Sequence, residues 1–183
     1  MNKKEIGVAE ILSKNGIVIL ATDTLYGIVG SAFSLSAVDR IFTLKQRAQN
    51  KPLIVLIESI SELEKFGVTL SKNLISKLNQ YWPGPFSISL DVTDDKFKYL
   101  HRDTNQIAFR IPDQPKLVEM LKKSGPLVAP SANTEGMPPA KTIAEAKNYF
   151  GDGVDFYLDD GLIEGNASTL IRLDGDEVIV IRK

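Results

Sequence analysis

Apolar residues recur every three or four positions in several segments, and this spacing predicts amphipathic helices. In residues 4–14 the pattern ends at Asn15 and Gly16, a pair typical of a helix C-terminus. Ser36 is expected to cap the helix that carries Ile41 and Phe42 on one face. Further helices are predicted at residues 61–67, from residue 71 to the break at 81–85, and at 115–125 and 142–151.

Short β-branched or alternating runs predict strands between these helices. Residues 86–92 alternate with period two, as in a strand with one solvated face. The last two runs are expected to form a hairpin with its turn at residues 174–176. The predicted strands are residues 17–22, 28–33, 52–57, 86–92, 106–112, 126–133 (running into a loop), 168–173 and 177–183.

The mixture of strands and helices predicts one α/β domain over residues 1–183, with a mixed β-sheet and flanking helices. We find no internal repeat and no convincing linker that would divide the chain. Strand and helix do not alternate strictly, which argues against a simple Rossmann fold.

Composition restricts the classes of function. The 183 residues are 43% hydrophobic and 25% charged, as in ordinary soluble proteins, and include no cysteine. The chain therefore has no disulfide, thiolate nucleophile or cysteine-based zinc site. The formal net charge of −1 indicates that any anion site is local rather than a broad basic surface.

The first residues, MNKKEIGVAEILSKNG, are interrupted by Glu5 and Glu10, unlike the apolar core of a signal peptide. No apolar run approaches the roughly 20 residues of a membrane-spanning helix. We therefore expect a cytoplasmic protein that has no contact with a membrane.

Familiar catalytic motifs are missing. The sequence has no G-x-x-x-x-G-K-[ST] and no G-x-G-x-x-G after a strand. His101 is the only histidine, and Ser131 lies in PSAN rather than in a G-x-S-x-G elbow. A mechanism built on a protein nucleophile is therefore disfavoured, and no metal ligand is assigned.

Polar residues instead follow strands, where ligands bind in open α/β sheets. Thr24 and Tyr26 follow the first strand, in a stretch that could equally be a simple Asp/Gly turn. Lys45, Arg47 and Lys51 lie between a helix and a strand; the helix dipole alone could account for the first two.

Four further polar residues carry the same ambiguity. Arg110 lies in an apolar run, where it either binds an anion or faces solvent from an alternating strand. Ser131 and Asn133 could form a binding loop or an Asx or Ser turn, and Ser168 could simply begin a strand. Taken together, fixed cations, hydroxyls and an amide suit a site that acts by positioning and charge stabilisation.

Six motifs occur in an order and spacing that resemble the YrdC-type threonylcarbamoyl-AMP synthases (TsaC-like, short form). They are ATDTLYG, LKQRAQNKPL, YWPGPFSISL, IAFRIPDQP, PLVAPSANTEGMPPA and NASTLI. The resemblance covers roughly residues 5–173 and implies a twisted mixed sheet around a concave, locally positive cleft. It further implies a nucleotidyltransferase that converts L-threonine, bicarbonate or CO2, and ATP into threonylcarbamoyl-AMP and pyrophosphate.

The resemblance also implies roles for individual residues. Lys45, Arg47, Lys51 and Asn133 match ATP contacts, with Lys45 and Arg47 expected to stabilise developing charge. The matches to threonine contacts are Thr24, Tyr26, Arg110, Ser131 and Ser168.

The chain departs from the family pattern at three positions. Ala21 stands where proline is usual, Glu135 replaces a common serine, and Leu56 replaces a histidine found near threonine in many members.

In this family the threonylcarbamoyl group passes to position 37 of tRNA. Mg²⁺ is expected to accompany ATP, while transfer proteins of tRNA modification and direct RNA contact stay open as further partners. Two alternatives also remain. One is a carbamoyl-adenylate-forming domain like that of hydrogenase-maturation proteins, disfavoured by the short, cysteine-free chain. The other is a double-stranded RNA-binding module, disfavoured by the near-neutral charge.

Overall fold

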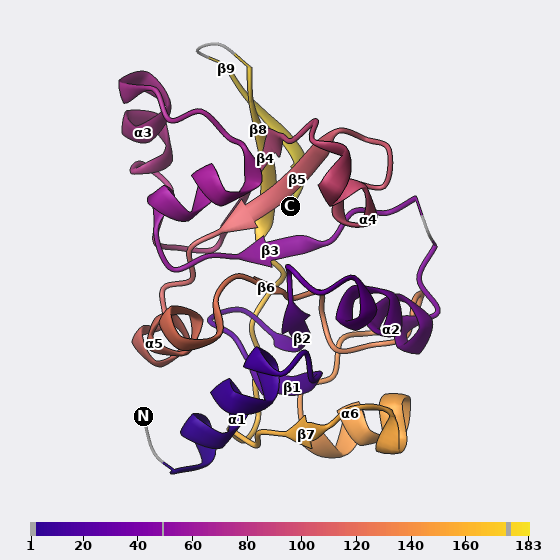
Figure 1. Ribbon diagram of the computed structural model, residues 1–183. Helices are drawn as coiled ribbons and strands as arrows, with labels where there is room; N and C mark the ends of the chain where they lie inside the picture. The colour runs from indigo at the N-terminus through magenta and orange to yellow at the C-terminus, as the bar shows by residue number, and fades with distance from the viewer. Residues whose placement is uncertain (1–2, 49, 175–176) are drawn as a thin grey trace.

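The computed structural model describes residues 3–48, 50–174 and 177–183. The strands of these residues form one mixed sheet in the order β7-β1-β2-β6-β3-β5-β4-β8-β9 (Figure 1). Their bounds are β1 Val18–Ala21, β2 Tyr26–Ser31, β3 Ile54–Leu56, β4 Phe86–Asp91, β5 Gln106–Arg110, β6 Leu127–Val128, β7 Phe156–Tyr157, β8 Thr169–Asp174 and β9 Glu177–Arg182. The pairs β1–β7, β3–β5 and β4–β8 are parallel and the others antiparallel, which confirms the predicted mixed α/β sheet.

Helices flank this sheet on both faces. The α-helices are α1 Lys3–Ser13, α2 Leu35–Lys45, α3 Lys72–Leu78, α4 Lys98–His101, α5 Pro115–Ser124 and α6 Ile143–Phe150. Three 3₁₀ helices join them, η1 Ile60–Phe66, η2 Asp95–Phe97 and η3 Gly151–Gly153. Within the described residues no helix is both long and apolar enough to cross a bilayer.

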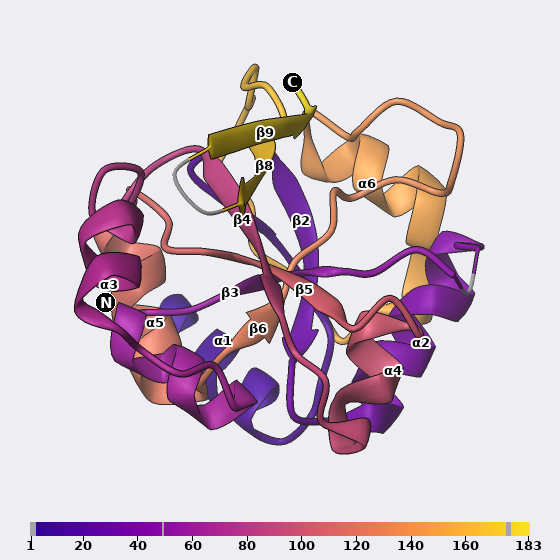
Figure 2. The ribbon, with the colours of Figure 1, turned by 90° about the horizontal axis from the view of Figure 1, so that it is seen from above.

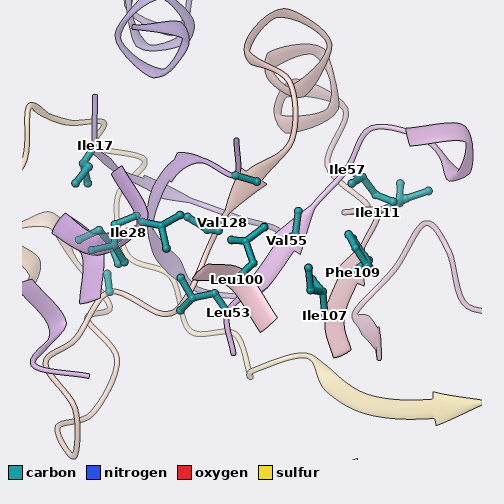
Figure 3. Packing of buried hydrophobic residues seen from close by; sticks show 14 of the residues in the cluster. Ile17, Ile28, Leu53, Val55, Ile57, Leu100, Ile107, Phe109, Ile111 and Val128 are labelled. Atoms are coloured by element: carbon teal, nitrogen blue, oxygen red, sulfur yellow. The ribbon is translucent and has the colours of Figure 1, made fainter. Parts of the chain in front are cut away.

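Two buried clusters separate these layers, because alternate strand residues point to opposite faces. On one face, Val18 and Leu20 of β1 pack with Leu12 of α1 and Leu121 of α5, two helices that lie side by side (Figures 1 and 2). The other face holds the larger cluster, where β1, β3 and β5 meet residues of α2, η1, α4 and α6. Figure 3 shows part of it, with Val55 between Val128 and the Ile107–Phe109 pair.

The face covered by α1 and α5 is the one that carries the cleft described below. Val29 and Leu56 are buried beneath these helices, whereas Gly27 and Ile54, two positions earlier on the same strands, line a cavity. Side chains two positions apart share a face. The helices therefore cover only part of this face, and the remainder is open to a ligand.

Local details differ from the sequence predictions. Ser34, not Ser36, caps α2, because its hydroxyl accepts a hydrogen bond from the N–H of Ala37. Residues 60–66 are a 3₁₀ helix, while η2, α4 and the two-residue β7 were not predicted. The hairpin of β8 and β9 is confirmed, although residues 175 and 176 of its predicted turn lie outside the described residues.

The last strand forms the edge of the sheet. All six residues of β9 are exposed, including the apolar run from Val178 to Ile181, and an irregularity in its pairing with β8 lies between Leu170 and Ile171. Figure 2 shows β9 at the rim of the molecule with the C-terminus at its end. Ile181 and Arg182 reach the cleft.

Candidate active site

A cavity of about 410 Å³ opens on the uncovered face of the sheet. Strands β2, β3, β4, β5, β8 and β9 contribute to its wall, together with the loops that follow α2 and β6. Its polar lining residues are Thr22, Thr24, Tyr26, Arg47, Asn50, Lys51, Ser89, Thr104, Gln106, Arg110, Ser131, Ser168 and Arg182. Four of these described residues are cations and none is a carboxylate, so the wall is suited to anionic ligands.

The structure brings most of the predicted site residues to this cleft. Those that line it are Thr24, Tyr26, Arg47, Lys51, Arg110, Ser131 and Ser168. Lys45 and Asn133 lie outside the lining set.

The first wall element is the tight turn between β1 and β2. The Thr22 hydroxyl donates to the carbonyl of Leu25 at 2.8 Å and accepts from the backbone N–H of Thr24 at 3.2 Å. It also lies 3.0 Å from the Thr24 hydroxyl. These bonds hold Thr24 at the cleft in a fixed orientation, with its side chain largely buried.

Tyr26 begins β2 rather than belonging to the loop, and its side chain is fully buried. The hydroxyl donates to the carbonyl of Gly161 at 2.8 Å and accepts from the backbone N–H of Asp160 at 3.0 Å. Burial raises the pKa of this phenol. Tyr26 therefore holds the segment before β8 against the sheet through its hydroxyl, and the residue is also among those that line the cleft.

Arg110 at the end of β5 is buried and paired, so it does not face solvent. Its Nη1 donates to Oδ1 of Asp23 at 2.5 Å, and the other carboxylate oxygen accepts from the backbone N–H of Asp113 at 3.1 Å. The Nε of Arg110 is buried and has no hydrogen-bond partner among the described residues. Asp23 thus orients the guanidinium, and the N–H group at Nε has no partner in the described part of the chain. A free donor of this kind is what binding of a second carboxylate, from a ligand, requires.

Burial lowers the pKa of Arg110, and the charge of Asp23 opposes this effect. The guanidinium nevertheless stays protonated at any physiological pH. The sequence did not identify Asp23 as a site residue, because aspartate is common in turns and needs no ionic partner there. The one available signal was an arginine in an otherwise apolar strand, which requires a buried counter-ion.

Arg47 and Lys51 lie on the segment between α2 and β3. The guanidinium of Arg47 donates from Nε to the carbonyl of Lys51 at 3.2 Å and from Nη2 to that of Pro52 at 2.9 Å. These bonds close the segment on itself and leave the remaining guanidinium N–H groups for a ligand. The amino group of Lys51 forms an ion pair with Glu135.

Lys45 has a different position from the one its motif predicts. It is 2% exposed, and its amino group donates to the carbonyls of Ser131 at 2.5 Å and Asn133 at 2.6 Å. Asn133 in turn donates from Nδ2 to the carbonyls of Thr134 and Met137. The two residues therefore hold the loop after β6, and their predicted direct contacts with ATP stay predictions.

Burial lowers the pKa of Lys45 to about 7 from 10.5; the charge of Arg47 acts in the same direction and that of Glu135 opposes it. Because the folded value lies below the unfolded one, the unfolded chain binds more protons between these two pH values. Stability contributed by Lys45 therefore rises as the pH increases from about 7 to 10.5.

We predict that the wild-type protein gains stability relative to Lys45→Met across this window, by up to about 1.4 kcal/mol per pH unit. Urea unfolding of both proteins at pH 7, 8.5 and 10 measures the difference. Lys72→Met, which removes an exposed lysine at the start of α3, is the matched control and should show no such trend. A difference that is constant or falls with pH contradicts the prediction.

Ser168 and Arg182 complete the wall next to β4 and β8. The Ser168 hydroxyl lies 2.8 Å from that of Ser87, and its carbonyl accepts a bond from Nη2 of Arg182 at 3.1 Å. Arg182 was not among the predicted site residues, because an arginine near the chain end has many ordinary explanations. Leu56 is fully buried and pairs with Arg110 in the β3–β5 register, so an apolar group stands beside the arginine.

The chemistry of this wall is electrostatic. The polar groups of its described residues are hydroxyls, amides and cations, without a paired nucleophile and base. Within the described residues no three histidine, aspartate or glutamate side chains are grouped so that they could hold a metal ion. A ligand here would be bound and oriented by charge and hydrogen bonds.

Comparison with known proteins gives this cleft a context. The family model for Sua5, YciO and YrdC, described as "Telomere recombination", matches residues 10–183. The chain belongs to the Sua5/YciO/YrdC family. It is 36% identical over 154 residues to the threonylcarbamoyl-AMP synthase of Actinobacillus succinogenes, covering 82% of this chain and 83% of the relative.

Longer family members match over part of their length. The threonylcarbamoyl-AMP synthase of Bacillus subtilis is 31% identical over 178 residues, which cover 95% of this chain and 51% of that protein. The crystal structure of P. abyssi Sua5 complexed with L-threonine superposes with a TM-score of 0.89 and 26% identity, over 98% of this chain and 53% of Sua5. The chain thus spans about half the length of these two family members, and its fold is confirmed as that of the family. The predicted boundaries of a single domain, residues 1–183, stay a prediction.

Proposed function

We propose that this chain is an L-threonylcarbamoyladenylate synthase. The observation that carries the proposal is a cleft in which Arg110, fixed by Asp23, faces the same cavity as Arg47 and Lys51. Relatives named threonylcarbamoyl-AMP synthase and a Sua5 crystallised with L-threonine support it. The substrates of the proposal are L-threonine, bicarbonate or CO2, and ATP, which enters as its Mg²⁺ complex.

In this proposal the threonine carboxylate binds Arg110. The unused Nε of Arg110 and its planar fork suit a carboxylate, and the pairing with Asp23 fixes the fork before the ligand arrives. Thr24, Ser131 and Ser168 supply hydroxyls for the polar groups of threonine. Tyr26 supports this wall through its hydroxyl, which holds the segment before β8 in place.

ATP binds on the side of Arg47 and Lys51, whose charges match its phosphates. Lys45 and Asn133 act behind the wall by fixing the loop that carries Ser131. The deprotonated threonine amine captures CO2 to give a carbamate and releases one proton to solvent. A carbamate oxygen then attacks the α-phosphorus, the bond to the β-phosphate breaks, and pyrophosphate leaves. The cations stabilise charge that develops during this step.

The product is an unstable mixed anhydride, so we propose that it is consumed in threonylcarbamoylation of tRNA at position 37 by partner proteins. We also infer a cytoplasmic location for this reaction.

The test is release of pyrophosphate from ATP by the purified protein. We expect release to require both L-threonine and bicarbonate, and omission of either to reduce it to background. A threonine-independent release would favour a carbamoyl-adenylate-forming domain, and binding of double-stranded RNA without any release would favour an RNA-binding module. Either result contradicts the proposed function.

A further inference from the structure

Glu135 connects the loop that carries Ser131 to the segment that carries Arg47 and Lys51. One carboxylate oxygen, Oε1, pairs with the amino group of Lys51, and the other, Oε2, accepts from the backbone N–H of Ala48 at 2.6 Å. The backbone N–H of Glu135 donates to the carbonyl of Lys45 at 2.8 Å. One residue of the loop after β6 thus has three contacts with the end of α2 and the segment that follows it.

These contacts fix the position of the cation. Arg47 already closes its own segment through the carbonyls of Lys51 and Pro52. Glu135 then attaches the closed segment to the loop that carries Ser131. The hydrogen bond from Lys51, and after it the one from the backbone of Ala48, lower the pKa of the Glu135 carboxyl group. Glu135 itself does not line the cleft, whereas Lys51 does.

The Glu135 carboxylate also binds the amino group of Lys51, which is the group expected to contact a phosphate of ATP. Lys51 is 55% exposed at its side chain, so its amino group is free to exchange one anion for another. A lysine is a flexible point charge and suits such an exchange better than a forked arginine does. The same carboxylate adds a negative charge close to a cleft whose wall is otherwise positive.

We propose that Glu135 is a positioning residue that holds Lys51 at the cleft and competes with the phosphates of a nucleoside triphosphate for its amino group. This inference rests on the proposed function, because it assumes that ATP binds beside Arg47. When ATP binds, Lys51 leaves the carboxylate for a phosphate, while Glu135 keeps its bond to the N–H of Ala48. Glu135 therefore lowers nucleotide affinity through its charge and preserves loop order through its hydrogen bond.

Two substitutions separate these effects. Glu135→Gln keeps an oxygen that can accept from Ala48 but removes the charge that competes for Lys51. Glu135→Ser removes both, and a serine hydroxyl at this position is too short to span the same gap. Glu119→Gln is the control, since Glu119 forms a surface ion pair with Lys122 on α5 outside the cleft lining.

The experiment measures binding of an ATP analogue with a methylene bridge between the α- and β-phosphates, by calorimetry with Mg²⁺ at low and at high salt. We expect Glu135→Gln to bind the analogue about two- to fivefold more tightly than wild type at low salt, the range of an exposed ion pair. The gain should shrink at high salt, because exposed charges are screened. Glu135→Ser should bind less tightly than Glu135→Gln, and Glu119→Gln like wild type.

A second comparison tests whether the effect passes through Lys51. In a Lys51→Met background the gain from Glu135→Gln should disappear. In the pyrophosphate assay the gain should appear as a lower KM for ATP with little change in kcat, which a general loss of structure would not produce. Equal or weaker binding by Glu135→Gln, or the same gain without Lys51, overturns the inference. Failure of the wild type to bind the analogue overturns the proposed function as well.

Discussion

Arg110→Ala is expected to weaken L-threonine binding by at least about a hundredfold and to lower the free energy of unfolding by about 3–5 kcal/mol. Threonine binding weakens because the planar guanidinium that would bind the threonine carboxylate is lost. The free energy of unfolding falls because Asp23, whose side chain is only 7% exposed, would keep its charge without the partner that it has at 2.5 Å. Calorimetric titration with threonine and urea unfolding measure the two effects.

Two further variants keep these effects apart. Arg110→Lys retains a charge near Asp23, so it should recover much of the stability but little of the threonine affinity, because an ammonium cannot reproduce the planar fork. Asp23→Asn leaves the guanidinium in place without its orienting carboxylate, and an intermediate loss of affinity is expected. Wild-type threonine affinity in Arg110→Ala would refute the assignment.

Gly165→Ala is expected to reduce the catalytic efficiency for threonine at least about tenfold and to destabilise the protein by about 1–3 kcal/mol. A Cβ atom at Gly165 would lie 1.8 Å from the carbonyl oxygen of Thr24, a backbone atom that cannot move without disturbing the turn. The segment before β8 would have to separate from that turn, although Tyr26 fastens it nearby through Gly161. Pyrophosphate release at varied threonine concentration, together with thermal unfolding, measures the change.

Gly7→Ala is the matched control for this glycine. Apart from its chain neighbours and the adjacent backbone of α1, no atom of the described residues lies within 4 Å of a Cβ built at Gly7, which is inside that helix. Alanine there should leave the reaction unchanged and add up to about 1 kcal/mol of stability, because it has the higher helix propensity. A fully active Gly165→Ala would show that close contact between the segment and the turn is not needed.

Sequence patterns were sufficient for the class of fold and for most of its elements, since these depend on local periodicity. The cap of α2 was misplaced by two residues because Ser34 and Ser36 are both good capping residues. The two-residue strand β7 escaped prediction, because it is held by its parallel pairing with β1 rather than by any pattern of its own. Strand order was likewise out of reach, as it depends on contacts between distant segments.

The same distinction applies to the site. The motifs identified residues that line the cleft, but they could not show which cations face it. Lys45 and Arg47 are two positions apart and were predicted to share one role, yet Lys45 is buried under a loop and Arg47 lies on the wall. Asp23 and Glu135 were not assigned roles, because their partners, Arg110 and Lys51, lie more than eighty residues away in sequence.

These long separations have a consequence for how the protein acquires its activity. Strand β6 lies between β2 and β3, so the centre of the sheet closes only when residues from the second half of the chain arrive. Loops of this length are closed at an entropic cost before their contacts contribute stability, which slows folding. The binding surface therefore exists only in the complete fold, and a partly folded chain has no partial site. Ligands that bind this surface stabilise the native state as a whole, so they should slow amide hydrogen exchange in the central strands as well as at the cleft.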